Sequence, residues 1–160
     1  MAPAEPAAMR ARVVEARERL RAIPDLGVGR LGEPDPKTGE RWNRLNTLGH
    51  LAEVLPFWCG QVRGVMAGAD AMGRGAAGYE QRQQAIAGGP GLGEAELRLR
   101  VDGGINELMR LLAELKPADL ERKVVYRTRQ GDEAAPLRHH LETLLVGHLE
   151  EHVGQLAELS

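Results

Sequence analysis

The chain has 160 residues, of which 42% are hydrophobic and 28% charged, values typical of a globular protein with one core. A formal net charge of −2 and an aromatic content of 3% give no reason to expect nucleic acid as a partner, because such surfaces need positive charge and stacking rings. No apolar run approaches the roughly 20 residues needed to cross a bilayer, so we expect no membrane partner.

The amino-terminal segment, residues 1–12, lacks the apolar stretch of a secretory signal. Cys59 is the single cysteine, so no internal disulfide can form. Both features fit a reducing cytoplasm. We therefore expect one cytoplasmic domain over residues 1–160.

Apolar residues at helical spacing predict a first helix over residues 5–22, which Pro24 ends. A loop rich in Pro, Gly and Asp follows over residues 24–39. The apolar period then returns from about residue 40 to residue 67 and predicts a second helix. Pro56 interrupts this helix, and we expect a kink rather than an end because the period continues beyond it.

Residues 68–93 are rich in glycine and predict a long crossover, with a short helix near residues 79–87. A third helix is expected over residues 94–115. Residues 123–128 are typical of a short strand or an extended arm. Pro136 then opens the last helix, which runs to about residue 159.

Four long helices and one long crossover predict an all-α fold, a four-helix bundle in which the crossover joins the second and third helices. A crossover of this length lets these two helices run in the same direction, whereas a short turn would force them antiparallel.

The last helix carries two histidines one turn apart, His148 and His152. Side chains at i and i+4 project from the same side of a helix, so two neutral imidazoles there can bind one metal ion. On a helical wheel both lie on the side of Leu145 and Leu156, where buried ring nitrogens need partners. Two structural histidines at the edge of the core are the alternative. A third histidine, His50, lies in the second helix and could complete the site.

Two other motifs compete with this interpretation. His148–His152 fits H-x-x-E-H, the inverted zinc-protease pattern, but those peptidases need a further carboxylate well downstream and the sequence stops at Ser160. Residues 27–32 fit G-x-G-x-x-G. A dinucleotide site needs a strand before this motif and a helix after it, and neither is expected here, so we interpret it as a loop.

The segment Trp42-Asn43-Arg44-Leu45-Asn46-Thr47-Leu48-Gly49-His50-Leu51-Ala52-Glu53, followed by Pro56-Phe57-Trp58, resembles the first metal-binding helix of the DinB/YfiT-like superfamily. The closing segment Val146-Gly147-His148-Leu149-Glu150-Glu151-His152-Val153-Gly154-Gln155-Leu156 resembles the final H-x-x-x-H helix of that family. The resemblance covers roughly residues 40–159. It implies an up-down-down-up bundle, often dimeric, with His50, His148 and His152 as ligands of a divalent metal.

Some members of that family are S-transferases or isomerases that use a low-molecular-weight thiol. The resemblance therefore implies a metal-dependent enzyme that acts on a small molecule, as a thiol-dependent S-transferase or a hydrolase. The alternative is a non-enzymatic bundle with a structural or sensing metal. Histidine nitrogens discriminate poorly among Zn²⁺, Ni²⁺, Fe²⁺ and Mn²⁺, so the sequence leaves the metal open.

Several neighbouring side chains receive lesser roles. Glu53 and Glu151 are interpreted as solvated or salt-bridged glutamates rather than bases, and Cys59 as a packing residue. His139 and His140 are expected in solvated or capping roles. An outer strip of the last helix, made of Val146, Val153 and Ala157, could receive a second subunit of a homodimer, with packing inside the monomer as the alternative.

Overall fold

The computed structural model describes residues 5–24, 31–34, 36 and 38–158. Its elements, in chain order, are α1 (Pro6–Ala22), α2 (Arg44–Met66), β1 (Ala71–Gly73), α3 (Ala76–Leu92), α4 (Glu94–Glu114), α5 (Pro117–Leu120), β2 (Lys123–Thr128), β3 (Gly131–Pro136), α6 (Leu137–Leu141), a π-helical turn (Glu142–Val146) and α7 (Gly147–Glu158). No described helix combines the length and the apolar character that a membrane span requires.

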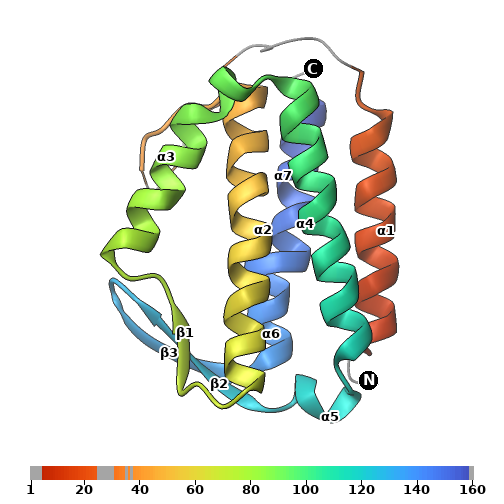
Figure 1. The fold of residues 1–160 in the computed structure, drawn as a ribbon, viewed down its shortest axis with the longest axis vertical. Helices are drawn as coiled ribbons and strands as arrows, with labels where there is room; N and C mark the ends of the chain where they lie inside the picture. The colour runs from red at the N-terminus through yellow and green to blue at the C-terminus, as the bar shows by residue number, and fades with distance from the viewer. Residues whose placement is uncertain (1–4, 25–30, 35, 37, 159–160) are drawn as a thin grey trace.

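Four long helical segments stand side by side: α1, α2, α4 and the last helix formed by α6, the π-turn and α7 (Figure 1). The chain colours show that α2 and α4 run in the same direction, opposite to α1 and α7. The crossover between α2 and α4 contains β1 and α3, and α3 packs against α2. The predicted long crossover is therefore present, and its helix is longer than the expected residues 79–87.

The prediction of an all-α fold was wrong in one respect, because the protein also contains a small three-stranded sheet. The strand order is β1-β2-β3, with β1 parallel and β3 antiparallel to β2. The predicted extended segment at residues 123–128 is β2. Its partners were missed because β1 has only three residues and the sequence of β3, Gly-Asp-Glu-Ala-Ala-Pro, lacks the β-branched and aromatic residues typical of strands.

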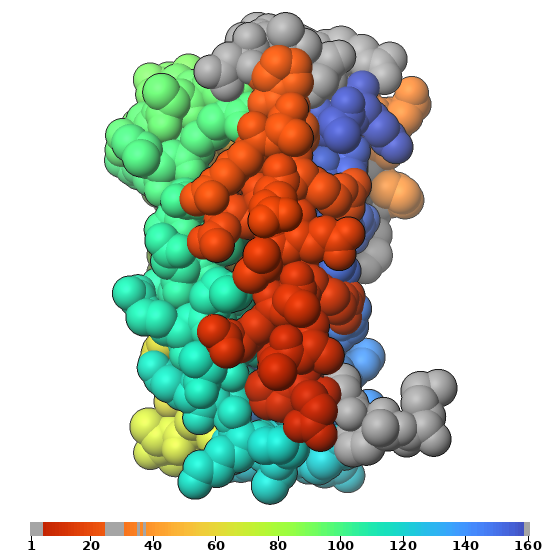
Figure 2. All heavy atoms as spheres, turned by 90° about the vertical axis from the view of Figure 1, so that its right-hand side faces the viewer, coloured from red at the N-terminus to blue at the C-terminus, as the bar shows by residue number. Residues whose placement is uncertain are grey.

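The outer side of the last helix is covered by α1. Figure 2 shows α1 as a continuous ridge between α4 on one side and α7 on the other. Val146 and Val153, assigned to an outer strip for a second subunit, are both fully buried within the chain, and Ala157 is exposed. Packing inside the monomer, the alternative interpretation, therefore accounts for the two valines.

Helices α2 and α3 approach so closely that glycines are required at the contact. A Cβ atom on Gly49 would meet the Ala85 carbonyl oxygen, and one on Gly89 would meet the Leu45 carbonyl oxygen. Both obstacles are backbone atoms, which cannot rotate away. This contact fixes α3 beside the turn of α2 that carries residue 50.

We expect Gly89→Ala to destabilise the protein by about 1–3 kcal/mol, because the added methyl group forces α2 and α3 apart. The control is Gly88→Ala in the same helix, where a Cβ would meet nothing within 4 Å. That change should be neutral or stabilising by up to about 1 kcal/mol, since alanine is the better helix former. Urea unfolding followed by circular dichroism measures both, and equal effects would contradict the close contact.

Candidate metal centre

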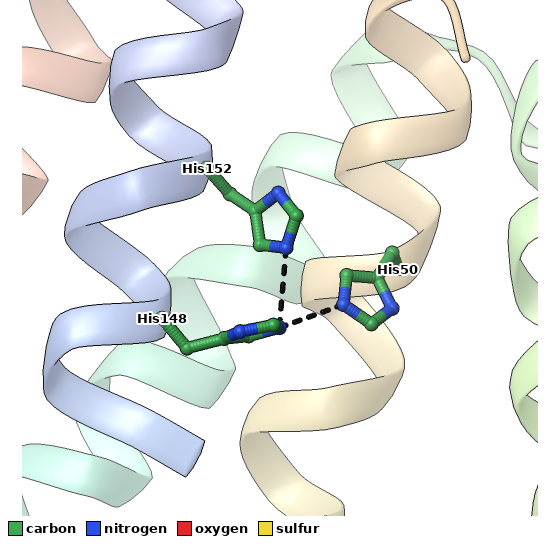
Figure 3. A group of neighbouring side chains, drawn as sticks. All are labelled: His50, His148 and His152. Atoms are coloured by element: carbon green, nitrogen blue, oxygen red, sulfur yellow. Dashed lines mark hydrogen bonds between the residues drawn. The ribbon is translucent and has the colours of Figure 1, made fainter. Parts of the chain in front are cut away.

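The three predicted histidines meet between α2 and α7. His50 projects from α2, and His148 and His152 project from α7 toward it (Figure 3). The Nε2 atom of His148 lies 2.8 Å from Nε2 of His50 and 3.1 Å from Nε2 of His152. His50 and His152 are 3% and 7% exposed, so the cluster lies largely below the surface.

The start of α2 is fixed by a capping box. The Asn43 side chain accepts hydrogen bonds from the backbone N–H groups of Leu45 and Asn46, while Oδ1 of Asn46 accepts from the Asn43 N–H. The helix therefore begins at Arg44 rather than near residue 40, and Trp42 lies before it. The Trp42 ring centroid is 5.1 Å from that of His50 and 6.0 Å from that of His152. Trp42 thus forms one wall of the cluster.

A π-turn immediately before α7 sets the direction in which His148 points. The backbone N–H of Gly147 donates to the carbonyl oxygen of Glu142, five residues earlier. A Cβ atom on residue 147 would lie 2.7 Å from that oxygen, so glycine suits this position. One extra residue in the turn rotates everything that follows by about 100° relative to a regular helix.

Arg12 of α1 contacts both the start of this π-turn and the helix α7 that follows it. Its guanidinium donates to the Glu142 carboxylate at 2.7 Å and to the Glu150 carboxylate at 2.5 Å. Hydrogen bonds from Arg12 hold the pKa of the Glu142 carboxyl below its ordinary value. Because Glu150 lies between His148 and His152 in sequence, the pair of contacts anchors the histidine-bearing turn to α1.

Hydrogen bonding inside the cluster is incomplete without a further partner. Nδ1 of His152 lies 2.7 Å from Oε1 of Gln155, which can only accept, so Nδ1 carries the proton and Nε2 presents a lone pair. Nε2 of His148 faces two ring nitrogens and can donate to only one of them. A divalent cation would satisfy all three Nε2 lone pairs at once, and ligand nitrogens within 4.8 Å of one another suit a single ion. The residues present therefore fit a metal ion.

Burial and positive neighbours keep the rings of His50 and His148 neutral. Burial, followed by the two other imidazoles, lowers the pKa of His50 far below its ordinary value. Burial lowers the pKa of His148 to about 3. Arg82 and Arg74 act in the same direction on both rings. Neutral imidazole is the form that binds metal, so the folded protein holds these ligands ready.

The cluster opens into a pocket of about 720 Å³. Besides the three histidines its lining includes Trp42, Thr47, Arg82, Glu151 and Gln155. Among the described residues, the histidine, cysteine, aspartate or glutamate side chains grouped closely enough to hold an ion are His50, His148 and His152 alone. An ion there would keep coordination positions open toward the pocket.

The two glutamates near the histidines differ. Glu53 is buried, and its carboxylate accepts two hydrogen bonds from Arg74, at 2.6 and 3.0 Å. The salt-bridged interpretation of Glu53 is therefore confirmed. Glu151 lies at the exposed rim of the pocket. Cys59 is fully buried, and burial raises the pKa of its thiol to about 12, as expected of a packing residue.

The adjacent His139 and His140 lie away from the cluster. His139 is exposed and contacts the Glu133 carboxylate at 2.8 Å. The solvated or capping role predicted for His140 was wrong: the ring is 1% exposed, and its Nε2 donates to the Val124 carbonyl oxygen at 2.8 Å. The sheet, which the sequence only partly indicated, covers this ring. Most of the G-x-G-x-x-G motif, residues 27–30, lies outside the described residues.

Sequence reasoning missed three residues that surround the histidines. Trp42 was counted as part of the second helix, and Arg82 lies in the crossover, where no period placed it. Gln155 follows His152 by three residues, a spacing that brings two side chains together on a helix and could have indicated the contact.

The buried imidazoles predict that the metal-free protein loses stability as the pH falls. Below the ordinary histidine pKa of about 6.5, the unfolded chain binds protons at histidines that stay unprotonated in the folded protein. The free energy of unfolding therefore falls as the pH is lowered. His148→Gln should make this decrease shallower by about 1 kcal/mol per pH unit down toward pH 3. Denaturant unfolding of metal-free protein between pH 7 and pH 5 measures the slope.

The control is His139→Gln, because the side chain of His139 is exposed and lies outside the cluster. Its slope should match that of the unchanged protein. If the His148 variant also retains the full slope, the ring is not held neutral by the fold.

Comparisons with known proteins identify the family and the fold. The family model of the DinB superfamily matches residues 4–156. A search of curated proteins found no match. Among solved structures, the chain is similar to the "Crystal structure of the mycothiol-dependent maleylpyruvate isomerase", with a TM-score of 0.65 and 19% identity over 96% of this chain. The chain spans 58% of the length of that protein, so the likeness concerns the fold. On the strength of the family match, which covers nearly its whole length, the chain belongs to the DinB superfamily.

Proposed function

We propose that this protein is a metal-dependent enzyme in which His50, His148 and His152 bind one divalent cation that activates a thiol or water for reaction with a small molecule. The observation that carries the proposal is the convergence of the three Nε2 atoms beside a pocket that the histidines help to line. Imidazole ligands are consistent with Zn²⁺, Ni²⁺, Fe²⁺ or Mn²⁺.

Three neutral ligands leave the ion its full positive charge. A cation in such a site lowers the pKa of a thiol or water and polarises a substrate oxygen. Neighbouring residues prepare the imidazole ligands for the ion. Gln155 fixes the tautomer of His152 through Nδ1, and Trp42 shields the imidazoles from bulk water. Glu151, at the rim, is exposed and could exchange protons with solvent.

A low-molecular-weight thiol is the co-substrate we favour, and S-transfer or thiol-assisted isomerisation the reaction. The support is the fold shared with a protein described as a mycothiol-dependent isomerase. Hydrolysis remains the second reaction that such a site can perform. A non-enzymatic metal protein is the alternative function, and a site closed by a fourth protein ligand would be typical of it.

The test combines metal analysis with a thiol reaction. We expect about one divalent ion per chain, and metal-dependent conjugation of a low-molecular-weight thiol to an electrophile such as a chlorodinitrobenzene or a maleyl compound. Chelator should abolish the reaction. His148→Ala should lower metal affinity at least about tenfold, because two imidazoles no longer form a three-nitrogen site.

His139→Ala is the matched control, since this neighbouring histidine lies outside the cluster. It should keep both metal and activity. Only trace metal after saturation would refute the metal site, whereas full metal with no thiol or hydrolytic reaction would favour the non-enzymatic alternative.

We also propose that the protein is a homodimer, on the family resemblance alone. Because Val146 and Val153 are fully buried within the chain, a second subunit would have to use another surface. Light scattering at rising concentration should give twice the mass of the 17.4 kDa chain. A mass equal to one chain at the highest concentration would refute the dimer.

A further inference from the structure

One positively charged side chain lines the pocket beside the histidine cluster and has no carboxylate partner among the described residues. Arg82 lies on α3, is partly buried and lines the pocket with the three histidines. Its guanidinium carbon lies 5.8 Å from the Trp42 ring centroid. Over the described part of the chain, no carboxylate lies within ion-pair distance of Arg82.

Other buried or partly buried arginines have oxygen partners. Arg44 pairs with Glu94 at 2.9 Å, and Arg74 pairs with Glu53 at 2.6 Å. Arg12 holds two carboxylates. A guanidinium that leaves water normally takes such a partner, because desolvation without one is costly. Among the partly buried arginines that the structure describes, Arg82 is the exception, and it lines the pocket.

The carboxylates that line the same pocket are engaged or lie at its rim. Glu40 accepts a hydrogen bond from Nε1 of Trp42 at 2.8 Å, and its other oxygen accepts one from Gln83 at 3.4 Å. Glu33, Glu151 and Glu158 are exposed. Their charges are screened by solvent, whereas the partly buried guanidinium is screened less.

Arg82 and the histidine cluster share one neighbour, Trp42. The centroid of the Trp42 ring is 5.1 Å from that of His50 and 5.8 Å from the Arg82 guanidinium carbon, so both groups lie beside the same aromatic ring. A molecule with a metal-binding group at one end and an anionic group a few atoms away could contact both while lying along Trp42.

We propose that Arg82 is a substrate-binding residue that pairs with a carboxylate of the small molecule held at the three-histidine site. A guanidinium presents two parallel N–H donors that match the two oxygens of a carboxylate, so the contact gives orientation as well as affinity. The inference rests on the proposed function and narrows its substrates to carboxylic acids.

The test uses the Co²⁺-loaded protein and two matched probes, imidazole-4-acetate and its methyl ester, at pH 8. Both can offer a neutral ring nitrogen to an open coordination position, and only the acid carries a carboxylate. Titration followed by the visible absorption of Co²⁺ gives both dissociation constants. We expect the acid to bind about tenfold more tightly than the ester, the range of a charge-assisted contact.

Arg82→Gln should remove this preference and leave the affinity for the ester unchanged. Arg82→Met keeps an unbranched side chain beside Trp42 and should lose the same preference for the acid. It replaces the glutamine variant in the test if that variant folds poorly. Arg110→Gln changes an exposed arginine on α4 and should keep the full preference, which controls for net charge.

Equal affinities for acid and ester in the unchanged protein would overturn the proposal. So would a preference that persists in both Arg82 variants, or an equal loss for acid and ester, which would mean that Arg82 supports the cluster itself. If Co²⁺ fails to bind, or the ester leaves the spectrum unchanged, the open metal site of the proposed function fails and the inference falls with it. If the ester binds and the acid gains nothing, only the carboxylate assignment fails.

Discussion

The structure depends on three imidazole Nε2 atoms that converge between α2 and α7. Each nitrogen is costly to bury without a partner, and the three cannot satisfy one another because a neutral ring offers only one proton. The fold nevertheless places His50 and His148 at 2.8 Å. A bound cation would supply the missing interaction and offset the free-energy cost of burying these nitrogens. The open pocket beside the cluster would let further ligands reach that cation.

The surrounding elements hold this arrangement from several directions. The capping box at Asn43 fixes where α2 begins, and the glycine contact with α3 fixes its neighbour. On the other side, the π-turn rotates His148 into place and Arg12 joins that turn to α1. A π-turn is a local irregularity that costs regular hydrogen bonding, and such turns occur frequently at functional sites. Here its consequence is geometric, since it sets the register of both histidines.

The two residues that flank the histidines, one of which we propose binds the substrate, come from the segments that connect the long helices of the bundle. Trp42 precedes α2 in the loop that follows α1, and Arg82 lies on α3 in the crossover. The bundle helices α2 and α7 carry the three histidines, whereas the connecting segments carry Trp42 and Arg82. This division is common in proteins, because loops can vary around a rigid scaffold without disturbing its core.

The sequence alone determined the long helices, the crossover and the three histidines, because helical periodicity is strong over 17 to 23 residues and the i, i+4 pair is a local pattern. Residues 123–128 were also recognisable as extended. Tertiary structure alone decided the rest. The sheet forms because β3 and β1 pair with β2, although their own sequences favour no strand. The burial of His140, the burial of Val146 and the place of Arg82 in one pocket with the histidines each depend on contacts between segments distant in sequence. No local pattern encodes such contacts.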